Sequence, residues 1–89
     1  MNGKSDRVIV VDDDAELRAL LRRFLTEHGF ETRAVESGTA LDRELSRNPA
    51  DVIVLDLMMP GEDGLAVCRR LRAAGDPTPI VMLTARGDA

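Results

Sequence analysis

Three short apolar runs in this chain end in polar side chains that could do chemistry. Residues 8–11 are followed by Asp12, Asp13 and Asp14, residues 52–55 by Asp56, and residues 80–83 by Thr84. If the runs are parallel strands, their carboxyl ends share one edge of the sheet, where open parallel sheets collect ligands. Neighbouring strands lie about 5 Å apart. Asp12 and Asp56 would therefore crowd one another if the first and third strands are adjacent.

Crowded carboxylates of this kind predict a cation site. Two unit charges 5 Å apart repel by roughly 3 kcal/mol at an effective dielectric near 20, and Asp13 adds a third negative charge. Hard oxygen ligands with room for water suit Mg²⁺, which also binds phosphate oxygens. A carboxylate held beside Mg²⁺ can attack phosphorus and form an aspartyl phosphate. We therefore expect Mg²⁺-assisted phosphoryl chemistry at Asp56, with the Thr84 hydroxyl donating a hydrogen bond to the phosphoryl group.

Each residue also has a purely structural interpretation. One of the three consecutive aspartates could cap a helix, but a cap needs only one of them. Asp56 or Thr84 alone could simply end a strand, so the functional hypothesis depends on their combination. Other polar residues are expected to be structural: Cys68 packs in the core, His28 ends a helix, and the basic face of Arg69, Arg70 and Arg72 is solvated.

The spacing of apolar residues predicts alternating strands and helices. Strands are expected over residues 8–11, 30–35, 52–55 and 80–84, and the third does not alternate, which suggests burial on both faces. The first helix carries an apolar stripe at three- and four-residue steps over residues 15–25 and ends at His28-Gly29. Ser37 caps a second helix that stops before Asn48-Pro49, since the residue before proline disfavours the helical region. A third helix presents Leu65, Cys68 and Leu71 and ends at Gly75. This βαβαβαβ order predicts a parallel sheet with right-handed crossovers.

Three segments resemble the strand-end motifs of a known family. Residues 10–14 (VVDDD), 54–64 (VLDLMMPGEDG) and 79–85 (PIVMLTA) look like those of two-component response regulator receiver domains, specifically the OmpR subfamily. The resemblance implies a flavodoxin-like (CheY-like), doubly wound parallel sheet, incomplete here, with strand order 2-1-3-4. It further implies site roles. Asp56 would accept a phosphoryl group from a sensor histidine kinase, Asp12, Asp13, Asp56 and the Met58 carbonyl would hold Mg²⁺, and Thr84 would be the switch residue. Ala85 would leave room for the phosphoryl oxygens, and the side chains of Met58 and Arg86 would flank the path of the hydrolytic water.

The chain also departs from the family pattern. Residues 1–89 are interpreted as a receiver fragment that lacks the fourth and fifth helices and the fifth strand with its lysine. Lys4 cannot replace that lysine, because it precedes the first strand and so belongs to the opposite end of the sheet. Residues 80–84 would then form an exposed apolar edge, and a sheet face beside the first helix would be uncovered. We therefore expect a homodimer or a domain-swapped assembly, or a marginally folded monomer.

Composition narrows the remaining function classes. The 89 residues carry a formal net charge of −4, typical of one small acidic domain, which argues against direct nucleic-acid binding. DNA would be contacted by the winged-helix domain that OmpR-type regulators carry and this chain lacks. With no apolar run long enough to cross a bilayer and one cysteine, a cytoplasmic protein without membrane contact is expected.

Two alternatives to a phosphoacceptor signalling module remain. The first is an assembly fragment that binds Mg²⁺ weakly but does not sustain phosphorylation. The second is an aspartate-nucleophile phosphatase, which is disfavoured because that class places a second acid two residues after its nucleophile, where this chain has Met58. A signalling module is therefore expected, and not an enzyme.

Overall fold

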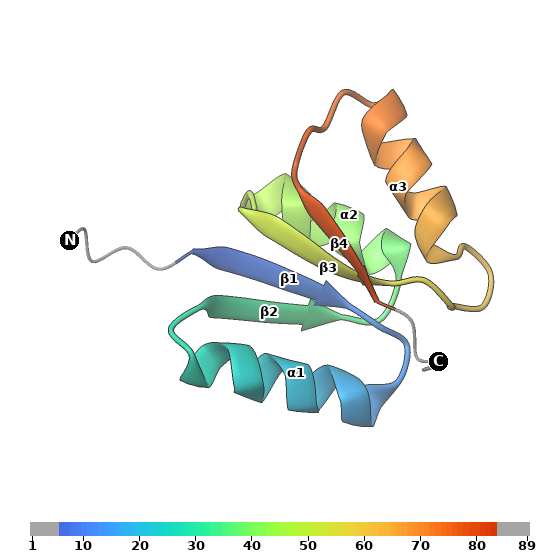
Figure 1. Cartoon of the computed structure of the whole chain (residues 1–89). Helices are drawn as coiled ribbons and strands as arrows, with labels where there is room; N and C mark the ends of the chain where they lie inside the picture. Colours follow the sequence, from blue (N-terminus) through green and yellow to red (C-terminus); the bar gives the residue numbers. More distant parts are fainter. Residues whose placement is uncertain (1–5, 84–89) are drawn as a thin grey trace.

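The computed structural model describes residues 6–83, which form a four-stranded parallel sheet with three helices (Figure 1). The elements follow one another as β1 (Arg7–Val11), α1 (Ala15–Glu27), β2 (Glu31–Val35), α2 (Gly38–Arg47), β3 (Val52–Asp56), α3 (Gly64–Ala73) and β4 (Ile80–Leu83). The strand order is β2-β1-β3-β4 and every neighbouring pair is parallel. The predicted fold class, element order and sheet order are therefore confirmed.

The helices begin and end where local signals place them. Asp14, Ser37 and Asp63 are the N-caps of α1, α2 and α3, and each side chain accepts a hydrogen bond from a backbone N–H of the first turn. Gly29 follows α1 with a φ of 93°, which is the left-handed conformation that glycine adopts most easily. These caps fix where each crossover leaves and rejoins the sheet.

The main core lies between the sheet and the two helices α2 and α3. Ile9 and Val11 of β1 and Ile53 and Leu55 of β3 are fully buried there. Leu41 of α2 and Val67 and Leu71 of α3 pack in the same cluster, while α1 lies against β1 and β2, away from α2 and α3 (Figure 1). The buried core therefore fixes the positions of the carboxyl ends of β1 and β3.

Two expectations about burial are wrong. Leu65 is 47% exposed and does not belong to the buried stripe of α3, which consists of Gly64, Val67 and Leu71. Leu71 is buried and the partly buried Cys68 packs against the core, as expected. Gly64 lies against the end of β3, where a Cβ would be 2.5 Å from the Asp56 carbonyl oxygen, and Val67 and Leu71 share its face of the helix at three- and seven-residue spacing. Similarly, β3 is not fully buried on both faces: its Val52 and Val54 are half-buried, because α1 lies over β1 and β2.

Candidate functional site

Asp12 directly follows β1 and is nearly inaccessible, with 2% of its surface exposed. Its backbone N–H donates to the Val35 carbonyl at 3.1 Å, which extends the β1–β2 ladder by one residue. Its carboxylate accepts the Asp14 N–H at 2.9 Å, and Arg18 of α1 donates to its carbonyl oxygen at 2.8 Å. The three consecutive aspartates therefore divide their tasks, because Asp14 caps α1 while Asp12 turns inward and Asp13 stays exposed.

Asp56 is the last residue of β3 and is held in a similar way. It is 7% exposed, and its Oδ1 accepts the Met58 N–H at 3.0 Å. The chain then turns so that the Gly64 N–H donates to the Leu57 carbonyl at 3.1 Å. A Cβ on Gly64 would lie 2.5 Å from the Asp56 carbonyl oxygen, so only glycine allows α3 to start this close to the end of β3. The site is thereby tied to the helix that follows it.

The sheet register brings the acids together. Val11 pairs with Leu55, so the residues that follow them, Asp12 and Asp56, lie side by side at the same edge. Each of Asp12, Asp13 and Asp56 offers one carboxylate oxygen, and these oxygens lie within 4.8 Å of one another. The convergence expected from the sequence is present in the structure.

Burial governs the electrostatics of this cluster. Loss of hydration raises the pKa of Asp12 above its usual 3.8, the Asp14 N–H opposes that rise, and the nearby Asp56 and Asp13 carboxylates add to it. Negative charge is therefore costly here without a counterion. Three carboxylate oxygens, two from buried groups and one from an exposed group, fit a small hard cation that retains some of its water.

Residues 8–89 match the model of the response regulator receiver domain, and this range covers most of the chain. The chain belongs to the response regulator receiver family. This confirms the resemblance carried by the three strand-end motifs.

The similar proteins are response regulators. The chain is 51% identical over 83 residues to the response regulator MprA of Mycobacterium bovis (strain BCG / Pasteur 1173P2), and 46% identical over 80 residues to MprA of Mycobacterium sp. (strain KMS). These matches cover 92% and 90% of this chain but only 36% and 35% of those proteins, so it spans about a third of their length. MprA is an OmpR-family regulator, which agrees with the expected subfamily.

Solved receiver structures share the fold. The receiver domain of Francisella response regulator 1452 superposes with a TM-score of 0.86 at 30% identity, covering 96% of this chain and 70% of that one. The BeF3-activated N-terminal receiver domain of Klebsiella pneumoniae RstA gives a TM-score of 0.81 at 32% identity, covering 93% and 70%. The Vibrio cholerae chemotaxis protein CheY4 gives 0.87 at 26% identity, covering 96% and 72%.

Of the remaining residues with an expected receiver role or place, only Met58 lies within the described residues. Met58 follows the acidic edge, and its side chain is 56% exposed, while its backbone N–H is used by Asp56. Thr84, Ala85, Arg86 and Lys4 lie outside the described residues, so their expected places stay predictions. Within residues 6–83, no helix is both long enough and apolar enough to span a bilayer.

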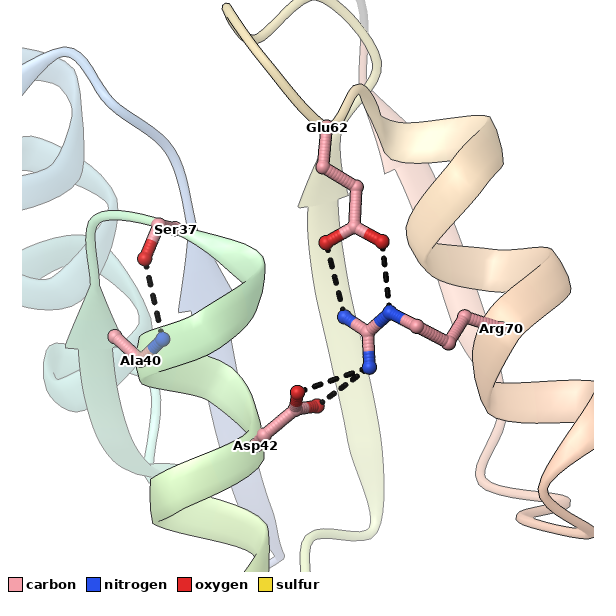
Figure 2. Close-up of polar contacts among 5 residues, drawn as sticks. All are labelled: Ser37, Ala40, Asp42, Glu62 and Arg70. Atoms are coloured by element: carbon pink, nitrogen blue, oxygen red, sulfur yellow. Dashed lines mark hydrogen bonds and ion pairs between the residues drawn. The ribbon is translucent and has the colours of Figure 1, made fainter.

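One polar cluster of this receiver was missed by the sequence interpretation. Arg70 of α3, expected to be solvated, pairs with Glu62 of the β3–α3 loop and with Asp42 of α2 (Figure 2). Glu62 also lines a cavity of about 240 Å³ beside the acidic edge, together with Asp13 and Gly38. Glu62 lies eight residues before Arg70 in the sequence and Asp42 lies twenty-eight residues before it, so no local pattern predicts these contacts.

Proposed function

We propose that this chain is the phosphoacceptor part of a two-component response regulator. Asp56 takes a phosphoryl group from the phosphohistidine of a sensor kinase, and the Mg²⁺ ligands are the carboxylates of Asp12, Asp13 and Asp56 with the Met58 carbonyl oxygen. Thr84 donates to the bound phosphoryl group. The observation that supports this most strongly is the convergence of three carboxylates at the ends of β1 and β3 in a receiver-family chain.

The contacts of Asp56 suit a nucleophile. Its Oδ1 accepts the Met58 N–H, which fixes the carboxylate plane and leaves the second oxygen to attack phosphorus. The new bond joins that oxygen to phosphorus, the bond from phosphorus to the imidazole nitrogen breaks, and neutral imidazole leaves after taking up a proton. Bound Mg²⁺ supplies compensation for the negative charge of the phosphoryl oxygens.

The rest of the signalling pathway is part of the same proposal. The longer relatives leave about two thirds of their length outside the region matched here, and we assign promoter recognition to a DNA-binding domain in such a region. The 89-residue segment itself is proposed to signal and not to catalyse reactions on other molecules. Its interpretation as a receiver fragment without a fifth strand, and its cytoplasmic location, stay predictions.

Intact-mass measurement tests the acceptor role. The chain is incubated with acetyl phosphate and Mg²⁺, and we expect a mass increase of one phosphoryl group that is absent in Asp56→Asn and in EDTA. The matched control is Asp51→Asn, since Asp51 immediately precedes the same strand at its opposite end and is exposed. Equal adducts on wild type and Asp56→Asn, or none on wild type, would refute the assignment of Asp56.

A second candidate function, an assembly fragment, is favoured by exposed apolar side chains. Leu20 and Phe24 of α1 are each 53% exposed and Val81 of β4 is 50% exposed. Large apolar side chains gathered on a surface often mark a protein interface. Self-association without phosphorylation in the mass experiment would select this alternative.

A further inference from the structure

Arg70 joins three parts of the molecule through one guanidinium group. Its Nε and Nη2 donate to the two carboxylate oxygens of Glu62 at 2.7 and 3.0 Å, and its Nη1 donates to both oxygens of Asp42 at 3.0 and 2.9 Å (Figure 2). Glu62 belongs to the β3–α3 loop, Asp42 to α2 and Arg70 to α3. We call these three residues the Arg70 bridge.

The Arg70 bridge lies where the β3–α3 loop comes close to the start of α2. A Cβ on Gly38 would lie 2.5 Å from Glu62 Oε1 and 2.9 Å from Val67 Cγ2. Ser37 holds this end of α2, because its side chain accepts the Ala40 N–H at 3.1 Å (Figure 2). Glu62 therefore rests against a fixed helix terminus as well as against Arg70.

The loop that the bridge holds is the one that leaves Asp56. Residues 57–63 connect β3 to α3, and their two ends are tied by the Met58 N–H on Asp56 and the Gly64 N–H on Leu57. Glu62 ties the outer part of the same loop to α2. The Met58 carbonyl, a proposed Mg²⁺ ligand, lies between these attachment points along the chain.

Stability alone does not account for such an arrangement. The side chains of Arg70, Asp42 and Glu62 are 40%, 45% and 34% exposed, and ion pairs at that exposure contribute little to the free energy of unfolding. A guanidinium that meets a carboxylate through two parallel hydrogen bonds does, however, define the orientation of both groups. Its effect is then on geometry more than on stability.

We infer that the Arg70 bridge is a positioning device that holds the β3–α3 loop so that the acidic edge binds Mg²⁺ more tightly. This inference rests on the proposed function, because it concerns the Mg²⁺ ligands assigned there. Arg70 acts through Glu62 and the loop, so it is a positioning residue and touches neither the ion nor the phosphoryl group.

The loss of charge and the loss of loop positioning predict opposite changes in Mg²⁺ affinity when Arg70 is replaced. Removing a positive charge from the protein strengthens cation binding at its carboxylates by simple electrostatics. Loosening the loop weakens cation binding, because a ligand and its supporting contacts lose their preferred place. The sign of the change therefore separates the two causes.

Mg²⁺ titration calorimetry compares Arg70→Met with Arg69→Met. Both variants remove one positive charge from adjacent positions of α3, and Arg69 is exposed and outside the bridge. We expect Arg70→Met to bind Mg²⁺ about three- to tenfold more weakly, below the range seen for residues that directly support a metal ligand. Arg69→Met should bind like wild type or slightly tighter.

Amide hydrogen exchange in metal-free buffer gives a second measurement. We expect the Met58 and Gly64 amides to exchange faster in Arg70→Met than in Arg69→Met, with urea unfolding midpoints verifying that both are folded. Binding by Arg70→Met as tight as or tighter than wild type overturns the inference. If wild type itself binds no Mg²⁺, the proposed Mg²⁺ site is refuted. The amide exchange rates of Met58 and Gly64 then test whether the bridge holds the loop. Rates that are unchanged in Arg70→Met overturn that role, and faster rates support it.

Discussion

Replacing Asp12 by asparagine should stabilise the metal-free protein. Asp12 is 2% exposed, and its carboxylate oxygen lies within 4.8 Å of oxygens of Asp13 and Asp56. Asparagine has nearly the same shape and keeps an oxygen that can accept the Asp14 N–H. Its amide N–H can also donate to a neighbouring carboxylate, so repulsion is replaced by a hydrogen bond.

The expected gain follows from the distances. Two unit charges 4.8 Å apart repel by about 3.5 kcal/mol at an effective dielectric of 20, and Asp12 takes part in two such pairs. Solvent screening at exposed Asp13 and residual repulsion in the unfolded chain reduce this sum. We expect a net gain of about 1–3 kcal/mol in the free energy of unfolding, and each kcal/mol raises the Tm of a domain this size by roughly 4–8 °C.

The assay is urea unfolding in EDTA and again in Mg²⁺. Glu31→Gln is the matched control, since Glu31 is an exposed carboxylate at the start of β2, and removing its charge should leave the midpoint unchanged. Mg²⁺ at ten times its Kd should raise the free energy of unfolding of wild type by about 1.4 kcal/mol and that of Asp12→Asn by less. The difference in stability between the two proteins should therefore be smaller in Mg²⁺ than in EDTA.

If Asp12→Asn in EDTA is no more stable than wild type while Glu31→Gln behaves as expected, the carboxylates do not repel one another in the folded state. The acidic edge would then have no electrostatic need for a cation.

Three further predictions concern other parts of the molecule. Gly64→Ala should lower the free energy of unfolding by roughly 1–3 kcal/mol, because its Cβ would meet the Asp56 carbonyl oxygen; an unchanged urea midpoint would contradict this. The hydrogen bonds from Arg70 lower the pKa of Glu62 below its usual 4.5. The extra stability of wild type over Glu62→Gln should therefore be fully present above pH 4.5 and be lost as the pH falls through the lowered pKa. Denaturation at several pH values measures it, and a pH-independent difference would count against it. Finally, concentration-dependent sedimentation should be reduced by Phe24→Ser or Leu20→Ser, and a wild type that stays monomeric at all concentrations would argue against the assembly candidate.

Much of the fold could be predicted because its signals are local. The aspartate and serine caps, the glycine after α1 and the apolar runs act within a few residues of where they stand. The convergence of Asp12 and Asp56 needed only one assumption beyond these, that β1 and β3 are neighbours. That assumption came from the topology of alternating strands and helices and from the family resemblance.

The details that failed depend on tertiary contacts. The buried stripe of α3 lies on the face where Gly64 approaches β3, which periodicity within the helix cannot reveal. The half-burial of Val54 reflects where α1 lies on the sheet. Arg70 is exposed, as expected, but it also has two carboxylate partners, Glu62 from the β3–α3 loop and Asp42 from α2, which only the folded arrangement brings to it.

The unequal burial of the three acids explains why the edge suits a hydrated ion. Asp12 and Asp56 are buried, and each carboxylate accepts the N–H two residues ahead, so their positions are fixed before any ion arrives. Asp13 is exposed and can adjust. Mg²⁺ gives up its water reluctantly. The proposed site, with two fixed carboxylates, one adjustable carboxylate and the Met58 carbonyl oxygen, would therefore leave room for water and for a phosphoryl oxygen. Exposure of Asp12 would weaken the repulsion among the three carboxylates, because water would screen its charge.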